Sequence, residues 1–578
     1  MIRKRFILII IFFIFLFLIN QKVFSSKINI SQFISPNTIA FFKINTSEKS
    51  WEYFLNRKPF SNLKESNLGK WILEKLRITI ELNSYEKIIF DPETDIIPIL
   101  GNEICVGILP SKNNEKDNFD FIGIINIKDN ERIVNIIDKI KTNLRTNGFK
   151  FEEKKYKDIK INSIILPEKI IKTNFTIIEN YFLITEDLET LKSIIDSYKN
   201  NEKSLFDSSE FQKNYKLILE NSNQILIYID FKKMSKIIEV LVKKDKNFRF
   251  LEKIIKNYLK TYEKFGAGIE INKNGIKINT INNFNFKNKI LKEMLNIKPI
   301  DFKQIIEVTP PEPLLFISSN QFNYWIKSIE LILPQGDKSV ELIKTGKKWF
   351  KVITGWDFEK DLIENSNGIS GLCLYYPKES SPFNLPNILI QYEVKDINKL
   401  QKNLKKLKLD FSFLSDELKN AIIKFNQSMI YKDIKIILLE KNDFINNLLE
   451  EVGFRAGYII NNNMMIVGSN IDTLKLSIDL KTKSVKSIQT DPHFAKILEE
   501  LKSKKNNLII YFNLKQFINV LSNFVGEDRA FKELTPSLQS IEDFGLLLVN
   551  TDNGLESKIL LNINMDKIDF EKVFDLLN

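Results

Sequence analysis

Apolar and polar positions change their spacing several times along the chain, and each spacing predicts a different element. Between Asp129 and Asn147 the apolar side chains recur every three or four residues, which places them on one face of a helix. Asp129 is the expected N-cap and Asn147-Gly148 the expected stop. The same spacing follows Asp396. We therefore predict two amphipathic helices with these apolar positions: Ile133, Ile136, Ile137, Ile140 and Leu144 in the first, and Leu400, Leu404 and Leu407 in the second.

Shorter runs rich in Ile, Val and Phe predict strands and hairpins on either side of these helices. The predicted strands are residues 39–44, 103–109 and 121–127 in the first half, and 314–317, 371–376 and 388–394 in the second. The predicted hairpins turn at Glu179-Asn180, at 461–463, and at the Asn-Gly pairs 274–275 and 553–554. Ser469 and Asp472 are expected to form a capping box before a later helix.

The predicted elements come twice and in the same order. Tyr-Lys-Asp-Ile-Lys-Ile occurs at residues 156–161 and again at 431–436, where its alternation predicts a strand with at least one buried face. Matching segments continue on both sides of the hexamer, at 128–129 with 395–396 and at 228–232 with 511–515. Such self-similarity indicates an internal duplication. The predicted fold class is α+β, with two tandem homologous units, each mainly antiparallel sheet with helices packed on one face.

The repeat sets the expected domain boundaries. Residues 27–285 are repeat unit 1 and residues 310–578 are repeat unit 2, with residues 286–309 as a linker that contains Pro299. Residues 1–25 are expected to be a signal peptide, because Arg3, Lys4 and Arg5 precede an apolar run at 6–19. That run is short for a bilayer span, which needs about 20 residues. The alternative is an uncleaved inner-membrane anchor at 6–19, and both interpretations place the remaining chain outside the cytoplasm, in the periplasm or cell envelope.

The basic balance of the chain comes almost entirely from lysine. The formal net charge is +12, and the chain has 85 Lys and Arg residues, of which only nine are Arg. Nucleic-acid readout favours the planar fork of arginine. The lysines are also mixed with acids along the chain, so we expect a solvated surface and no nucleic-acid partner, with an acidic envelope surface as a minor alternative.

Candidate catalytic residues are scarce. His493 is the single histidine, and Glu210 takes its place in the other repeat, so we interpret it as a polar residue in the first turn of a helix. With one histidine, a metal site built on histidines or a Ser-His-Asp triad lacks its parts. The segment 368–372 lacks the second glycine of a nucleophile elbow, and no Walker or dinucleotide motif occurs. We predict no catalytic, cofactor-binding or metal residue, although a hydrolase based on carboxylates alone stays open.

Cys105 and Cys373 are the two cysteines, at almost equivalent places in the two repeats. We expect buried free thiols, because a disulfide needs Cα atoms within about 7 Å and equivalent sites in tandem domains lie a domain width apart. A bridge across a pseudo-twofold interface is the alternative. Acidic triplets also recur in both halves, and we interpret them as capped, charged loops, with a weak cation site as the alternative: Asp91, Glu93 and Asp95, and Asp357, Glu359 and Asp361.

Several of these segments resemble one known family. They are residues 36–45, 91–101 and 182–185, and above all 486–494, with Asp491-Pro492-His493-Phe494 before a helix and Tyr511-Phe512-Asn513-Leu514 after it. Together they resemble the exported bacterial family known only as domain of unknown function 3352, over most of residues 30–570 and in two half-copies. The resemblance implies an envelope protein and brings no catalytic residues.

We therefore expect a non-enzymatic envelope protein that binds a protein or polymer partner through a sheet surface or a cleft. The alternative is a carrier for a lipid or another apolar ligand, suggested by the many Phe and Ile residues. Peripheral membrane contact is a further candidate, and no cofactor is expected.

Overall fold

The structure is a computed structural model, and contacts divide the chain into two compact units. Unit 1 comprises Met1–Asn283, Glu527–Ser540 and Ile563–Asn578, and unit 2 comprises Phe284–Gly526 and Ile541–Asn562. Each unit is described by itself. The structure describes residues 30–47, 70, 78–81, 87–90, 97–111, 119–146, 150–165, 172–219, 223–244, 262–272, 275–284, 289–324, 338–376, 386–410, 422–440, 455–501, 505–525, 535, 537–552 and 554–564.

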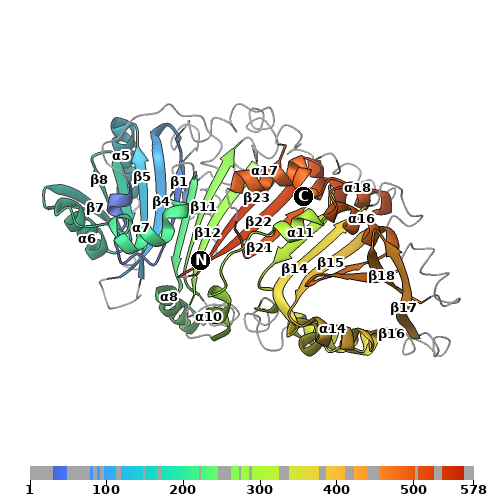
Figure 1. Ribbon diagram of the computed structural model, residues 1–578. Helices are drawn as coiled ribbons and strands as arrows, with labels where there is room; N and C mark the ends of the chain where they lie inside the picture. The colour runs from blue at the N-terminus through green and yellow to red at the C-terminus, as the bar shows by residue number, and fades with distance from the viewer. Residues whose placement is uncertain are drawn as a thin grey trace. The chain divides into compact units, whose positions relative to one another are not determined.

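Unit 1 is built on an antiparallel sheet, as the alternating apolar runs predict (Figure 1). From one edge to the other its strands lie in the order β12-β11-β10-β1-β4-β5-β9-β8-β7-β6. The strands are β1 (Ala40–Asn45), β4 (Leu100–Pro110), β5 (Phe119–Ile127), β6 (Lys150–Tyr156), β7 (Ile159–Ile165), β8 (Lys172–Ile178), β9 (Tyr181–Thr185), β10 (Ile225–Asp230), β11 (Tyr262–Asn272) and β12 (Gly275–Phe284). A separate pair joins β2 (Ile78–Glu81) to β3 (Lys87–Phe90).

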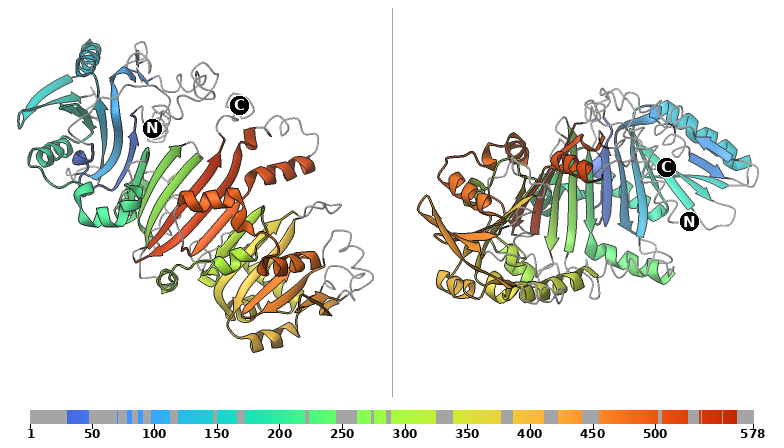
Figure 2. Two further views of the ribbon diagram at one scale, coloured as in Figure 1. Left: turned by 45° about the horizontal axis from the view of Figure 1, so that its top comes forward. Right: turned by 90° about the vertical axis from the view of Figure 1, so that its right-hand side faces the viewer.

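Helices cover both faces of the unit 1 sheet, which corrects the prediction of helices on one face. On one face α6 (Leu188–Lys199) and α7 (Ser209–Tyr215) pack on Ile122, Ile124 and Leu183. On the other face α5 (Asn130–Thr146) packs Ile133 and Ile137 on alternate residues of the same strands, such as Ile127 and Phe175. Figure 2 shows α5 and α6 on opposite sides of these strands. Strands that are apolar on both faces need two helix layers, because each face has to be removed from water.

Unit 2 contains strands in the same order as unit 1. The order is β23-β22-β21-β13-β14-β15-β20-β19-β18-β17, and β16 (Lys408–Asp410) adds to β17. The other strands are β13 (Leu315–Ser319), β14 (Ser366–Tyr375), β15 (Asn387–Val394), β17 (Ile422–Tyr431), β18 (Ile434–Leu439), β19 (Gly457–Asn461), β20 (Met464–Gly468), β21 (Leu508–Phe512), β22 (Ile541–Thr551) and β23 (Gly554–Ile563).

Two helix layers recur in unit 2. On one face α16 (Ile471–Lys481) and α17 (Pro492–Leu501) pack on a core that includes Phe316, Leu389 and Ile466. On the other face α14 (Ile397–Leu404) packs on Tyr392 and Met465. The remaining helices are α8 (Phe231–Lys244), α10 (Lys289–Leu295), α11 (Lys303–Glu307), α13 (Lys338–Thr354), α18 (Leu514–Val525), the π-helix η8 (Phe358–Ile363), and short 3-10 turns. The segment 286–309, expected as a linker, contains α10 and α11, and Ile305 is buried in the unit 2 core.

The repeated hexamer spans a hairpin turn between two strands, which corrects its prediction as one continuous strand. β6 ends at Tyr156 and β7 begins at Ile159, with Lys157 and Asp158 between them at φ 46° and 64°. Residues Lys432 and Asp433 show φ 48° and 63° in the hairpin of β17 and β18. Two consecutive left-handed residues make a type I′ turn, the turn whose twist matches that of a two-residue hairpin. Alternation alone cannot distinguish this arrangement from a strand, because both place Tyr and the first Ile in extended backbone.

The hexamer also attaches each hairpin to a helix. The Tyr156 hydroxyl donates to the carboxylate of Asp196 on α6 at 2.9 Å, and Lys157 Nζ lies 2.8 Å from the same carboxylate. In unit 2 the Tyr431 hydroxyl donates to Asp479 on α16 at 3.1 Å, and Lys432 Nζ lies 2.7 Å away. A lysine ammonium also lies over each tyrosine ring, at 5.6 Å and 5.8 Å from the centroid: Lys192 and Lys475. The identity of the hexamers therefore reflects one conserved tertiary contact in each unit.

Most other predicted elements are confirmed within the described residues. Asp129 accepts from the Arg132 amide, and Asp396 accepts from the Lys399 amide, so both are N-caps as expected. The hairpin turn at Glu179-Asn180 is confirmed. The predicted capping box of Ser469 and Asp472 is wrong, because Asn470 caps α16 and Ser469 Oγ accepts from the Ile388 amide of β15.

No helix among the described residues is both long and apolar enough to span a membrane. Residues 1–25, for which a signal peptide is expected, lie outside the described residues.

The type I′ turns predict a gain in stability on glycine substitution. Asp158→Gly and Asp433→Gly should each raise the free energy of unfolding by about 0.5–1 kcal/mol, because glycine adopts positive φ without strain. The lost ion pair of Asp158 with Lys155 is solvent-exposed and contributes little. Urea unfolding measures the change. Asp158→Val is the matched control and should destabilise, since a β-branched residue disfavours this backbone conformation; equal effects of Gly and Val would contradict the turn assignment.

Candidate functional site

Two places in the described residues combine features that a binding or catalytic site needs. One is a polar cluster around His493 in unit 2. The other is an apolar pocket on the sheet of unit 1. We describe the cluster first, because it contains the single histidine that the sequence singled out.

His493 lies in the first turn of α17, where the sequence placed it. Its Nδ1 lies 2.7 Å from Oδ2 of Asp543, whose side chain is 1% exposed. Tyr511 donates its hydroxyl to the other carboxylate oxygen at 3.1 Å, and Asn562 donates to Oδ2 at 3.3 Å. Burial raises the pKa of Tyr511 well above its usual range, and the Asp543 carboxylate adds to the rise. Both side-chain oxygens of Asp543 thus have hydrogen-bond partners, as buried polar groups require.

His493, Glu542 and Asp543 place one potential ligand atom each within 4.8 Å of one another, and they are the one such group among the described residues. Two observations argue against a metal there. The Asp543 oxygens already accept hydrogen bonds from Tyr511 and Asn562. In unit 1 the corresponding position pairs Glu210 with Lys264 at 2.9 Å. An ammonium cannot ligate a metal, so both units have an ionic or hydrogen-bonded pair at this place and not a metal site. In unit 1 the acidic residue of the pair lies on the helix, and in unit 2 it lies on the strand.

The remaining candidates of the sequence have structural roles where they are described. Asp357 caps η8 by accepting from the Glu359 and Lys360 amides, and the Asp361 carboxylate accepts from the Asp357 amide. Asp91, Glu93 and Asp95 lie outside the described residues. Residues 368–372 lie in β14, where Gly368 has φ +91° at a register shift against β15. A Cβ there would lie 2.7 Å from the Asn320 carbonyl oxygen, so this glycine serves a β-bulge.

Cys105 and Cys373 are both fully buried and free, as predicted. The strand register corrects their equivalence. Cys105 pairs with Lys43 of β1, whereas Cys373 pairs with Phe316 of β13. The residue of unit 2 that corresponds to Cys105 is therefore Gly371. The two corresponding inward-facing positions of β4 and β14 therefore carry one cysteine and one glycine in each unit. Along β4 the cysteine comes first, and along β14 the glycine comes first.

The apolar pocket has a volume of about 310 Å³ and lies on β4, β5 and β9. Its lining includes Val106 of β4, Phe121 and Ile125 of β5, and Ile184 of β9, all half-buried. These side chains alternate with Ile122, Ile124 and Leu183, which belong to the core on the other face. The pocket therefore opens on the face that carries α5. Volumes of about 300–1,000 Å³ and apolar linings are typical of small-molecule sites.

One residue of the pocket lining, Gly123, has no side chain. Gly123 pairs with Val106 on one side and with Ile184 on the other. A Cβ at Gly123 would lie 2.7 Å from Cγ2 of Ile184. In unit 2 the residue between the corresponding partners, Leu372 and Val467, is Ile390. The sequence analysis missed this site, although a glycine inside an apolar strand, aligned with an isoleucine in the repeat, was an available signal.

One end of the pocket is polar and is held by a buried carboxylate. Thr173, Thr185 and Glu186 complete the lining there. Asp120, 3% exposed, accepts from the amides of Phe121, Glu186 and Asp187, at 2.8, 3.2 and 3.1 Å. Burial raises the pKa of Asp120 to about 6, and these hydrogen bonds oppose the rise. Through these hydrogen bonds Asp120 fixes the backbone after the end of β9, beside the pocket.

A family model described as "Protein of unknown function (DUF3352)" matches residues 5–408 and 372–573. No curated protein matches the chain. Two crystal forms of TP0453 are similar in structure, at 9% identity and a TM-score of 0.24 for form I and 12% and 0.22 for form III. The match with form I covers 46% of this chain and 84% of the TP0453 chain, and the match with form III covers 49% of this chain and 86% of the TP0453 chain. At these TM-scores the likeness supports no inference about fold or function.

The two thiols should be unreactive in the folded protein. Burial raises the pKa of Cys105 to about 12 and also raises that of Cys373, so neither forms a thiolate at pH 8. We expect no reaction with an aromatic disulfide reagent in buffer, and reaction of both thiols in about 6 M guanidinium chloride. Cys105→Ser should halve the signal of the unfolded protein. A fast-reacting thiol in the native state would contradict the burial.

Asp120 should give unit 1 a distinct dependence on pH. Its pKa is about 6 when folded and 3.8 in the reference state, so the folded protein binds the extra proton between these values. Stability from this group is therefore present at low pH and lost as pH rises through about 6. The difference in unfolding free energy between wild type and Asp120→Asn should grow by about 1–3 kcal/mol from pH 7.5 to pH 4.5 in favour of wild type. A constant difference, measured by urea unfolding, would contradict the raised pKa.

Proposed function

The chain belongs to the family described as protein of unknown function DUF3352, and from this premise we propose that it is a non-enzymatic, exported protein that binds an apolar ligand in unit 1. The pocket beside Gly123 is the observation that carries the proposal. It is apolar along three strands and polar at one end, as a site for a chain with a polar head requires.

The residues at the polar end of the pocket narrow the class of ligand that we propose. Glu186 is exposed at the polar end, and Thr173 and Thr185 lie beside it. A carboxylate at the rim repels a second carboxylate, so a free fatty acid is a poor ligand. The ligand class we propose is a hydrocarbon chain with an uncharged or zwitterionic head, such as a lysophospholipid. Export rests on residues 3–19, whose charged and apolar segments are those of a signal peptide.

We also propose that units 1 and 2 arose by duplication of one unit. The shared strand order, the two type I′ turns and the two tyrosine–aspartate contacts support this. Ile390 fills the position of Gly123 in unit 2 and is 42% exposed. Binding is therefore assigned to unit 1. The protein or polymer partner that the sequence favoured first stays a prediction, which capture from envelope extracts would test.

Filling the pocket with the residues of unit 2 tests the proposal. The double variant Gly123→Ile and Ile184→Val reproduces the pair Ile390 and Val467, which the same strands of unit 2 accommodate. Each CH₂ group excluded from the pocket removes about 0.8 kcal/mol of binding free energy. Losing about two or three of them weakens binding about tenfold or more. The probe is the neutral dye N-phenyl-1-naphthylamine, with displacement by lysophosphatidylcholine and by laurate.

The matched control is Ile390→Leu with Val467→Ile, which changes the corresponding strands of unit 2 and leaves the pocket intact. Wild type and control should bind the dye equally, and lysophosphatidylcholine should displace it better than laurate. Native mass spectrometry should show a co-purified lipid-sized mass on wild type and not on the filled variant. Dye binding that the filled variant retains would refute a site at Gly123.

A further inference from the structure

The outward face of α13 in unit 2 is unusually apolar. Leu342 is 71% exposed, Trp349 46% and Val352 48%. Their spacing of seven and three residues places them on one side of the helix. Single exposed apolar residues are ordinary on protein surfaces, but three large ones on one helix face mark an interaction surface.

The inner face of α13 is held firmly, so its apolar side is fixed outward. Phe350 packs edge-to-face on Phe358 of η8, with ring centroids 5.4 Å apart. Lys347 Nζ lies 2.7 Å from Glu359. Trp356, just after the helix, donates its indole N–H to the Asn403 carbonyl of α14 at 3.0 Å. These contacts join α13, η8 and α14 into one layer on the outer face of the unit 2 sheet.

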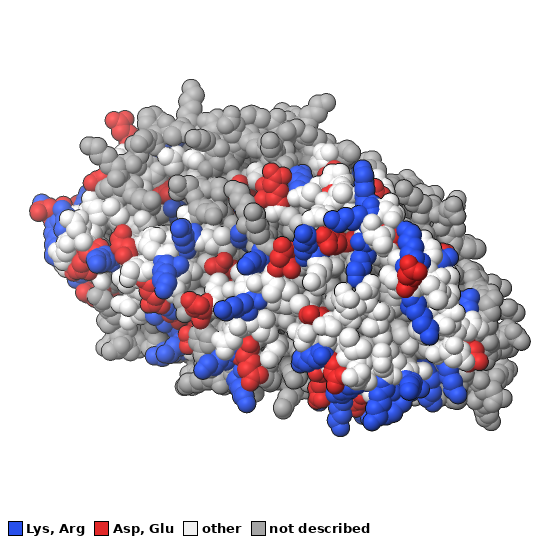
Figure 3. Space-filling view, in the orientation of Figure 1, with Lys and Arg blue, Asp and Glu red and all other residues white. Residues whose placement is uncertain are grey.

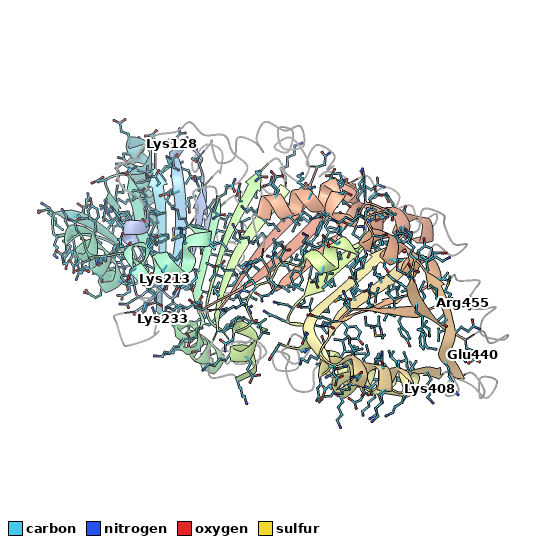
Figure 4. All side chains as sticks on the ribbon, in the orientation of Figure 1. Lys128, Lys213, Lys233, Lys408, Glu440 and Arg455 are labelled. Carbon is cyan, nitrogen blue, oxygen red and sulfur yellow. The ribbon has the colours of Figure 1, made fainter. Side chains whose placement is uncertain are left out.

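Lysines surround this face. The sequence of α13 has five lysines and one glutamate, and residues 397–408 have five lysines and no acid. Figure 3 shows lysines gathered along the lower right edge, where α14 lies in Figure 1, and Lys408 is labelled there in Figure 4. The exposed members are Lys344, Lys348, Lys351, Lys399, Lys402, Lys405 and Lys406. We call these lysines, with Leu342, Trp349 and Val352, the α13 surface.

We propose that the α13 surface binds an anionic phospholipid membrane, with Leu342, Trp349 and Val352 in the headgroup region and the lysines on lipid phosphates. A helix with Lys on its polar side and Trp and Leu on its apolar side is typical of interfacial binding. Each lysine near an anionic bilayer adds about 1 kcal/mol. A nucleic-acid partner fits less well, because α13 and residues 397–408 contain no arginine.

The inference goes beyond the proposed function, because it concerns unit 2 and does not depend on the pocket. It gives the protein a place to meet the bilayer from which an apolar ligand would come. Lys351 is partly neutralised by Asp357 at 3.1 Å, so Lys344 and Lys348 are the charges of α13 to test.

Cosedimentation with vesicles tests the α13 surface. The protein is the chain from Ser26 onward, which keeps every described residue and lacks the apolar segment 6–19. We expect binding to vesicles with phosphatidylglycerol, weakened by added salt, and much weaker binding to pure phosphatidylcholine. Lys344→Glu with Lys348→Glu, and separately Leu342→Ser with Trp349→Ser and Val352→Ser, should each reduce the binding about tenfold or more.

Two matched variants serve as controls. Lys213→Glu with Lys216→Glu reverses exposed charges in unit 1, where Figure 4 labels Lys213, and Ile430→Ser with Val485→Ser removes exposed apolar residues outside α13. Both should bind like wild type, and thermal unfolding should show all variants folded. Equal binding to both kinds of vesicle, or binding unchanged in the α13 variants, would overturn the proposal. Loss on charge reversal alone would overturn the insertion of Leu342, Trp349 and Val352 and indicate purely electrostatic attachment to the lipid phosphates.

Discussion

A hydrogen bond from a hairpin tyrosine to a helix aspartate joins the outermost hairpin of each unit to its helix layer. Tyr156 and Tyr431 are the last strand residues before the hairpin turns, and Asp196 and Asp479 lie near the ends of α6 and α16. An outer hairpin has few neighbours of its own, so it depends on such a contact for its position. The lysine of each turn adds an ion pair to the same carboxylate. The contact needs Tyr, Lys and a tight left-handed turn together, which accounts for the same residue types at these positions in both units.

Elements with a strong local signal were predictable from the sequence. The amphipathic helices after Asp129 and Asp396 are examples, because the capping residue and the spacing of the apolar residues indicate the same element. The hexamer was assigned to a strand, because a type I′ turn of Lys and Asp lacks the usual Asn-Gly signal. The second helix layer was missed, since a strand that is apolar on both faces shows no clean alternation. Burial of Cys105 and Cys373 was expected, while their shifted register depends on strand pairing that no single sequence shows.

The pocket could not be predicted from the sequence. Gly123 gives no specific signal there, because a glycine in a strand can have several structural causes. Only the pairing with Val106 and Ile184 shows that this glycine lies on an apolar face and in close contact with a methyl of Ile184. Comparison with Ile390, at the corresponding position of unit 2, then shows that the scaffold does not require a glycine there. The residue at this position depends on its partner strand, because a methyl of Ile184 takes the space beside Gly123 in unit 1, whereas the smaller Val467 lies beside Ile390 in unit 2.

The same comparison separates structural residues from functional candidates elsewhere. Where both units keep a contact in different residues, as with Glu210 and Lys264 against His493 and Asp543, the contact serves the fold, whatever chemistry a histidine suggests. Where one unit departs from the other, the departure marks a residue whose substitution tests a role outside the shared scaffold. Gly123 is such a departure in unit 1. On α13, Leu342 and Val352 are exposed, while Phe350 packs on Phe358. Two units with the same strand order thus act as controls for each other, and the residues that differ between them at corresponding positions are those to substitute first.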